Sequence, residues 1–370
     1  MPHKDLPIRP LADAFDPVGP DTLGVPELDW ASLFRKKSYP EDAPLILYPE
    51  ELNVPWHCSF PYTRQAKWWA EAADAGRELV HGIMLDKANA NSIPFELEDE
   101  RRKWKVDELV EDAVSCCTYL YPTSTPKRLA LLTQAVVLLF FHDDVIERGA
   151  SKDDSTVVDE FLTRAPKNKH LKRFCEEVME CDSFLGLELI DGIYKFVRDG
   201  RLKSPFRQDH YKTLAEYFLY RRNDVGKTFM IAAIRFGTGY PSTQEEIAPL
   251  DYVTDLWTMH LAVHNDLYSY DKEMYELKNF QASVVNTVYV VEKLLCVNPT
   301  LAKNITRDIT FDWEKEIYAI CEKWTHDPAT TEGQRVHLES LFDSMAGNIF
   351  HSATLSRYVR HGERPVPTRT

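Results

Sequence analysis

Apolar residues recur at three- and four-residue spacing along most of the chain, which is the pattern of helices that bury one face. Helix-breaking segments separate these stretches, for example "GTGYPS" at residues 237–242 and "NPT" at 298–300. No strand-like alternation with hairpin signals stands out. The pattern therefore predicts an all-α fold, with long helical stretches that include residues 64–88, 103–120, 126–148, 206–238, 247–274, 305–325 and 332–359.

The N-terminal part of the chain is rich in proline, and half of the 22 prolines lie within residues 1–61. Proline lacks an amide N–H and has a fixed φ, so residues 1–60 are predicted to be extended or partly disordered. Residues 61–360 are predicted to form a single helical domain, and residues 361–370 a C-terminal tail. A chain of 370 residues can bury a substantial core in such a domain.

Charge and composition exclude several kinds of partner. The net charge is −14 and there is no basic block, so neither nucleic acid nor an anionic membrane surface is expected to bind. No run of about 18 or more apolar residues predicts a membrane-spanning helix, and the N-terminus lacks the apolar segment of a signal peptide. The 7 cysteines show no zinc-binding spacing and are predicted to be reduced. We therefore expect a cytoplasmic protein without a stable membrane anchor.

One predicted helix ends abruptly in carboxylates, in the string "LLFFHDDVIE". Asp143 and Glu147 are four residues apart and share one helix face, whereas Asp144 points elsewhere. One interpretation is a helix end that enters water, with Arg148 and Gly149 as its end signals. The other is a divalent cation site, because carboxylates at a helix C-terminus oppose the helix dipole unless a cation compensates them.

A second predicted helix repeats this arrangement in the string "HNDLYSYDKE" at residues 264–273. Asn265, Ser269 and Glu273 are spaced four residues apart, so an amide oxygen, a hydroxyl and a carboxylate line one stripe of the helix. A polar face on an amphipathic helix is the simpler explanation of this stripe alone. Because both apolar helices end in stacked oxygen ligands, the sequence favours a cluster of cations held between them.

In these motifs the chain resembles the class I terpene synthases, most closely the fungal sesquiterpene synthases. The string "DDVIE" has the DDxxE form of the family's aspartate-rich motif, and "NDLYSYDKE" matches its metal motif NDxxSxxxE. Arg221 in "YRRNDVG" lies 44 residues before Asn265, where the family has its diphosphate-sensing arginine. The string "SRYVR" supplies the C-terminal pair Arg357 and Tyr358. One departure is Val225, which follows Asp224 where the family usually has a smaller residue.

The resemblance implies a helical bundle around a central apolar active-site cavity, a linear isoprenyl diphosphate as substrate and Mg²⁺ as cofactor. Three Mg²⁺ ions are expected, with Mn²⁺ able to substitute. The implied metal ligands are Asp143 and Glu147 on one wall, and Asn265, Ser269 and Glu273 on the other. The implied diphosphate-binding residues are Arg221, Lys272, Arg357 and Tyr358, because N–H and O–H donors suit phosphate oxygens. Two carboxylates are expected behind them, Asp144 paired with Arg357, and Asp224.

A carbocation formed from such a substrate needs a dry cavity, and aromatic faces stabilise cations. Phe140 lies three residues before Asp143 on nearly the same face, so we expect Phe140 to act in catalysis together with Asp143 and Arg221. Core packing is the commoner role for aromatic residues of this kind, including the weaker candidates Trp257, Phe184, Tyr220 and Phe350. The histidines beside the motifs, His142, His260 and His264, are interpreted as packed or surface residues rather than general bases.

The predicted function is therefore a Mg²⁺-dependent terpene cyclase that ionises farnesyl diphosphate and cyclises the cation to a sesquiterpene hydrocarbon or alcohol. The alternatives are a diterpene cyclase that uses geranylgeranyl diphosphate, an isoprenyl chain-elongating transferase and a non-catalytic helical scaffold. A chain-elongating enzyme would carry a second aspartate-rich motif in place of Asn265, Ser269 and Glu273, which favours cyclisation. A homodimer is left open.

Overall fold

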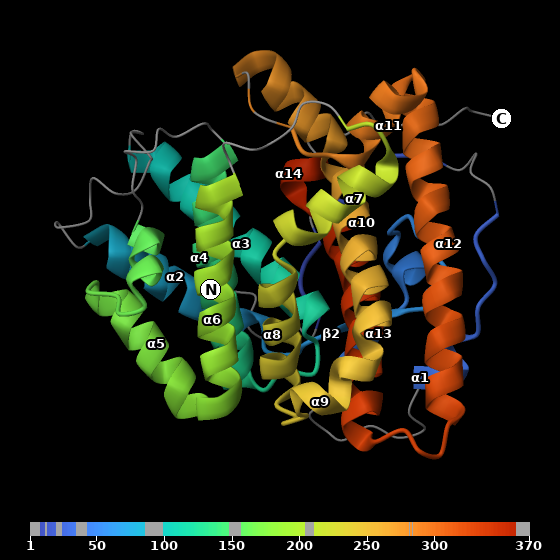
Figure 1. Ribbon diagram of the computed structural model, residues 1–370. Coiled ribbons are helices and arrows are strands. Elements are labelled where there is room, and N and C mark those ends of the chain that lie inside the picture. Colours follow the sequence, from blue (N-terminus) through green and yellow to red (C-terminus); the bar gives the residue numbers. More distant parts are fainter. Residues whose placement is uncertain are drawn as a thin grey trace. The chain divides into compact units, whose positions relative to one another are not determined.

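A computed structural model of the chain describes residues 8–11, 13–19, 24–34, 43–85, 99–147, 157–203, 211–280, 282 and 284–359 (Figure 1). For some residues in these ranges the structure describes the backbone but not the side chain; these are residues 84–85, 99–105, 143–147, 157, 201–203, 223 and 280.

Helices form nearly all of the regular structure in the described ranges, which confirms the all-α prediction (Figure 1). The longer helices are α2 (Trp69–Leu85), α3 (Asp99–Leu120), α4 (Pro126–Glu147), α5 (Lys169–Cys181), α6 (Ser183–Lys203), α7 (Leu214–Asp224), α8 (Lys227–Thr238), α10 (Asp251–Phe280), α11 (Thr287–Leu295), α12 (Pro299–His326) and α13 (Glu332–Thr354). Shorter elements are the helices α1 (Trp30–Phe34), α9 (Gln244–Ile247) and α14 (Ser356–Val359), the 3₁₀ turns η1 (Pro49–Leu52), η2 (Val157–Thr163) and η4 (Ala248–Leu250), and the strands β1 (Leu45–Leu47) and β2 (Thr63–Gln65).

The chain divides into two compact units, each with its own set of helices. The first unit contains α2 to α6 and α8, and comprises Met1–Arg9, Ala66–Arg207 and Gly226–Pro241. The second unit contains α1, α7, α9 to α14 and both strands, and comprises Pro10–Gln65, Gln208–Val225 and Ser242–Thr370.

Helix α4 is covered by other helices of the first unit, since it contacts α2, α3, α5, α6 and α8. Its residues Leu129, Leu132 and Ala135 are fully buried. Contacts on several sides explain why the apolar residues of α4 do not form a single stripe, as they would on a helix at the protein surface.

Helix α10 has the corresponding place in the second unit, where it contacts α7, α11, α12, α13 and α14. Trp257 of α10 is buried, and its Nε1 donates a hydrogen bond to Ser344 Oγ of α13 at 2.7 Å. This long helix therefore links most elements of the unit, and it is the helix that carries the motif at residues 264–273.

Part of the proline-rich segment packs against the helices of the second unit. The amide of Phe15 donates to Ala353 O of α13 at 3.0 Å, and Asp16 forms a buried ion pair with Arg307 of α12. Trp30 is fully buried, and its ring lies 5.1 Å from that of Phe60. Extended backbone thus coexists here with aromatic packing, which the proline content alone did not predict.

The predicted helical stretch at residues 206–238 is wrong in one respect, because the chain breaks inside it. Helix α7 ends at Asp224, Gly226 adopts a φ of 82°, and α8 begins at Lys227. Glycine readily adopts a φ in the left-handed region, so Gly226 ends the helix. The break occurs even though this chain has Val225 where the family usually has a smaller residue.

The predicted helical start at residue 64 is also wrong, because Thr63–Gln65 form β2 and pair antiparallel with β1. All three residues of β2 are buried. A run this short carries too little periodicity to distinguish a strand from a helix. In the described part of the chain, no helix combines the length and apolar character that crossing a membrane requires.

Candidate active site

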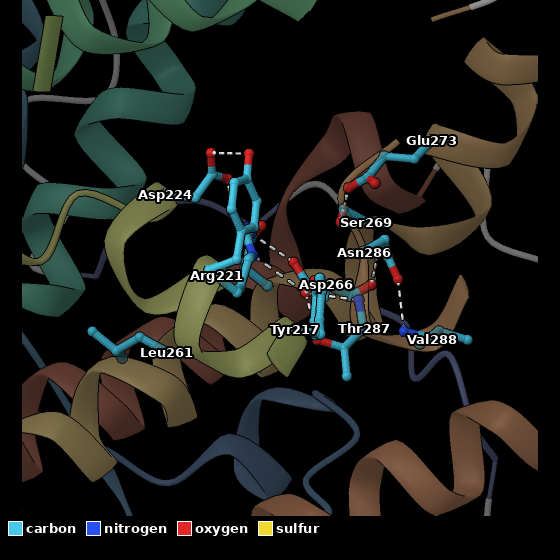
Figure 2. Close-up of polar contacts among 12 residues, drawn as sticks. Tyr217, Arg221, Asp224, Leu261, Asp266, Ser269, Glu273, Asn286, Thr287 and Val288 are labelled. Atoms are coloured by element: carbon cyan, nitrogen blue, oxygen red, sulfur yellow. Dashed lines mark hydrogen bonds and ion pairs between the residues drawn. The ribbon is translucent and has the colours of Figure 1, made fainter. Parts of the chain in front are cut away.

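The predicted oxygen ligands of α10 lie on one side of the helix, at successive turns. Ser269 Oγ donates a hydrogen bond to Glu273 Oε1 at 2.5 Å (Figure 2). Asn265 Nδ2 donates to Tyr358 Oη of α14 at 3.0 Å. Ser269 is buried, whereas Asn265 and Glu273 are half-buried and keep contact with solvent. The structure therefore brings one member of the C-terminal pair to the stripe.

The other predicted diphosphate donors of the second unit lie on the same helices. The guanidinium of Arg357 lies 5.4 Å from the ring centroid of Tyr358, on the short helix α14 that contacts α10. Lys272 of α10 forms an ion pair with Glu276 Oε2, with Nζ at 3.1 Å. Cationic side chains thus stand beside the oxygen stripe, on α10 itself and on α14.

Arg221 is held between two carboxylates in the second unit (Figure 2). Its Nη2 lies 2.6 Å from Asp266 Oδ1, and its Nη1 lies 2.9 Å from Asp224 Oδ2. Burial would lower the pKa of Arg221, but the charges of Asp266 and Asp224 outweigh burial and raise that pKa above its ordinary value. The guanidinium therefore stays charged and fixed in orientation, which is what a sensor of diphosphate requires.

Asp266 was not among the predicted site residues, yet it is the centre of the contacts around Arg221. Its carboxylate is fully buried and also accepts hydrogen bonds from Tyr217 Oη at 2.9 Å, from the amide of Thr287 at 2.8 Å and from Thr287 Oγ1 at 2.6 Å. Asn286 Nδ2 donates to the backbone carbonyl of Asp266 at 2.7 Å. One side chain therefore joins α7, α10 and α11, as Figure 2 shows. Asp266 follows Asn265 directly, so helical periodicity places it away from the ligand stripe but does not show what it contacts there.

The neighbouring Arg222 has a different environment. Its Nη1 lies 2.6 Å from Asp255 Oδ2, and both side chains are about one-third exposed, at 33% and 30%. Asp255 lies near the start of α10, so Arg222 is directed away from the ligand stripe. Arg221 and Arg222 therefore have different carboxylate partners, and only Arg221 is paired with the buried Asp266.

The fold of α7 explains the position of Arg221. Thr213 caps the helix by accepting a hydrogen bond from the amide of Glu216, and α7 contacts both α10 and α11. At the other end, Tyr220 Oη donates to Asp224 Oδ1 at 3.1 Å. With both ends fixed, the last turn of α7 holds Arg221 against α10.

The carboxylates of the other predicted wall lie outside the described side chains. Helix α4 runs to Glu147, as predicted, but the side chains of Asp143, Asp144 and Glu147 are not among those described. Phe140 is half-buried on α4. These residues belong to the first unit, and the α10 stripe belongs to the second. Two expectations therefore stay predictions. One is a metal cluster bound by both sets of ligands, and the other is the pairing of Asp144 with Arg357.

The aromatic candidates differ in burial. Trp257 and Phe350 are buried, and the side chain of Tyr220 bonds to Asp224 as described above. Phe184 is 52% exposed at the start of α6, so neither core packing, the commoner expectation, nor a place in an enclosed cavity wall describes it. The presence of an aromatic residue near a helix end does not by itself show whether that end is buried or exposed.

The three histidines are all buried, which agrees with their interpretation as packed side chains. His142 lies edge-on to Phe196, with ring centroids 6.3 Å apart. His260 and His264 lie together on α10, beside Glu314 of α12.

Comparison with known proteins identifies the family. A family model described as terpene synthase family 2, C-terminal metal binding, matches residues 202–316, which include Arg221 and the α10 stripe. Terpene cyclase 6 of Gibberella fujikuroi is 61% identical over 371 aligned positions, covering 100% of both chains. Aristolochene synthase of Aspergillus terreus is 23% identical over 65% of this chain and 78% of its own length.

The fold agrees with these sequence relationships. The crystal structure of aristolochene synthase from Penicillium roqueforti superposes with a TM-score of 0.62, covering 81% of this chain and 99% of that one at 20% identity. At 20% identity, the likeness to this structure shows the fold alone. The 61% identity to a fungal terpene cyclase over the full length of both chains shows the family. The all-α chain, with its oxygen stripe on α10 and its fixed arginine on α7, therefore belongs to the fungal class I terpene synthases.

Proposed function

We propose that this terpene synthase is a Mg²⁺-dependent sesquiterpene cyclase that ionises farnesyl diphosphate and cyclises the resulting carbocation. The observation that carries the proposal is the meeting of Asn265 with Tyr358, because it joins predicted metal ligands to a predicted diphosphate donor. A preference for a C15 substrate is supported by the relatives named aristolochene synthase, since aristolochene is a sesquiterpene.

The donor set on α10 fits a hard divalent cation. Asn265, Ser269 and Glu273 offer an amide oxygen, a hydroxyl and a carboxylate, and Mg²⁺ prefers such oxygens together with water and substrate phosphates. Asp143 and Glu147 of α4 are proposed as the ligands of the first unit. When bound, the metal neutralises the diphosphate leaving group, which also accounts for an anionic substrate in a protein of net charge −14.

The chain's own cations orient the diphosphate in this proposal. Arg221 has more N–H donors than Asp266 and Asp224 use, so it can bind phosphate oxygens while its orientation stays fixed. Lys272, Arg357 and Tyr358 donate further hydrogen bonds to the same group. Donors that are already in place stabilise the charge that develops as the C–O bond ionises.

The carbocation is then protected from water by apolar side chains. Phe140 of α4 is proposed to present its ring to the cation, because an aromatic face attracts positive charge. The ring skeleton of the product follows from the shape of this apolar surface.

A substrate panel tests the proposed function. The chain is incubated with Mg²⁺ and, separately, with geranyl, farnesyl and geranylgeranyl diphosphate, and the extracts are separated by gas chromatography. We expect cyclic C15 products from farnesyl diphosphate as the main activity. Cyclic C20 products alone would instead show a diterpene cyclase, and longer linear diphosphates formed with isopentenyl diphosphate would show chain elongation.

Arg221→Lys is expected to lower kcat/KM for farnesyl diphosphate by about 10- to 100-fold, because hydrogen bonds to charged groups contribute roughly 1.5–3 kcal/mol. Lysine keeps the charge but not the planar fork that Asp266 and Asp224 hold. Steady-state kinetics provide the measurement. The matched control is Arg222→Lys, which alters only a partly exposed ion pair with Asp255 and should change kcat/KM by less than about 3-fold. Equal effects of the two substitutions would contradict the assignment of Arg221.

A further inference from the structure

A second group of metal-type ligands lies inside the second unit, apart from the oxygen stripe. His260 and His264 stand one turn apart on α10, and Glu314 faces them from α12. One ligand atom of each residue lies within 4.8 Å of those of the other two. The three side chains are 0%, 1% and 0% exposed, respectively, so the group is enclosed between the two helices.

The geometry of this group suits a single transition-metal ion. His260 Nε2 lies 3.2 Å and His264 Nε2 lies 3.8 Å from the same carboxylate oxygen, Glu314 Oε1. Zinc binds nitrogen and oxygen ligands at about 2.0–2.2 Å, so two ligands of one tetrahedral ion are separated by about 3–4 Å. Two histidines four residues apart on a helix can reach one ion from the same face.

Some buried ring nitrogens of this group have no hydrogen-bond partner within the described part of the chain. Neither ring nitrogen of His264 makes a hydrogen bond within the described part of the chain, and the same holds for Nδ1 of His260. Buried polar atoms normally have partners, because an unpaired buried donor or acceptor is destabilising. His260 Nε2 already bonds to Glu314 Oε1 at 3.2 Å, so a bound ion would give a new partner to His264 Nε2, which has none within the described part of the chain.

The carboxylate of Glu314 is oriented for such a role by the backbone. The amide of Ser59 donates to Glu314 Oε2 at 2.8 Å, which leaves Oε1 directed at the two rings. Supporting hydrogen bonds of this kind are characteristic of metal-binding carboxylates. Arg307, whose charge also acts on His264, is itself paired with Asp16, so its charge is compensated.

We infer that His260, His264 and Glu314 form a buried Zn²⁺ site that ties α10 to α12. Imidazole nitrogens favour zinc over Mg²⁺, which takes oxygen ligands, so the site is chemically distinct from the Mg²⁺ stripe at Asn265. The inference stands apart from the proposed function, since zinc binding here requires no isoprenoid substrate.

Metal analysis of the full chain tests the inference. The protein is expressed with zinc in the medium, dialysed against metal-free buffer and analysed by mass spectrometry for metals. We expect about one zinc ion per chain, because the three side chains form a single group. Glu314→Gln and His264→Asn should lose this zinc. The control His337→Asn removes another buried histidine of the unit, which bonds to Thr254 Oγ1 at 3.1 Å, and should retain it.

Zinc at background level in the wild-type chain overturns the inference, as does equal zinc content in all three variants. Should the ligand variants fail to fold, the wild-type chain grown with Co²⁺ decides: a visible spectrum of tetrahedral cobalt supports the site, and its absence overturns it. Neither readout depends on catalysis. A chain that binds zinc but makes no terpene overturns only the proposed function, whereas an active chain without zinc overturns only the zinc site.

Discussion

Combining Asn265→Leu with Ser269→Ala is expected to reduce turnover of farnesyl diphosphate on the order of 1,000-fold or more, because charge-stabilising groups at a reacting centre have effects of this size. The double substitution removes the amide oxygen and the hydroxyl from the α10 stripe and leaves the carboxylate of Glu273. Metal affinity falls, whereas the fold loses little, since Asn265 is only half-buried and its side chain makes one hydrogen bond among the described residues, to Tyr358.

The turnover number at saturating Mg²⁺ provides the measurement, with circular dichroism to show that the helices remain. Asn279→Leu is the matched control, because Asn279 is an exposed residue of the same helix whose side chain donates to the backbone carbonyl of Tyr275. It should leave turnover unchanged. A double variant that still cyclises at nearly the wild-type rate would show that the stripe is merely a polar helix face.

Asp266→Ala is expected to lower the free energy of unfolding by roughly 3–5 kcal/mol, the usual effect of removing one partner from a buried ion pair. The substitution leaves Arg221 without its closest carboxylate, and leaves the donors of Tyr217 and Thr287 unpaired inside the unit. Because Asp266 joins α7, α10 and α11, the loss affects the contacts of three helices together.

Urea unfolding followed by circular dichroism measures this change. Asp255→Ala is the control, since it removes the partner of Arg222 from a pair that is about one-third exposed, and it should cost less than about 1 kcal/mol. Equal losses in the two variants would mean that Asp266 is an ordinary ion-pair residue and not the centre of the network.

The site on α10 could be predicted because its information is local. Asn265, Ser269 and Glu273 are spaced by one helical turn each, so knowing that the segment is helical places all three on one stripe. The order of the motifs along the chain then indicated the family. Phe140 and the α4 carboxylates rest on the same local reasoning, and they stay predictions.

The network behind that site could not be predicted, because its members are distant in sequence. Tyr217, Asp266 and Thr287 meet only after α7, α10 and α11 have packed together. Helical periodicity shows that Asp266 points away from the stripe, but it does not show what lies on that side. The same holds for Glu314, which lies far along the chain from His260 and His264.

The observed helix boundaries differ from the predicted ones where the backbone conformation of a single residue ends a helix. Gly226 separates α7 from α8 through its positive φ, within a stretch whose apolar spacing looked continuous.

Trp30, in the proline-rich segment, is anchored by aromatic packing and by a hydrogen bond from its Nε1 to Ser59 Oγ at 2.9 Å. Tertiary contacts of this kind override what composition predicts for a segment.

Release of diphosphate from farnesyl diphosphate, measured with and without a chelator, tests the central claim most directly. The claim is that the oxygen stripe of α10 and the fixed Arg221 ionise an isoprenyl diphosphate together with Mg²⁺. We predict that EDTA abolishes diphosphate release and that added Mg²⁺ restores it, because the cations of the chain alone do not neutralise the leaving group. Undiminished release in excess EDTA would contradict the account.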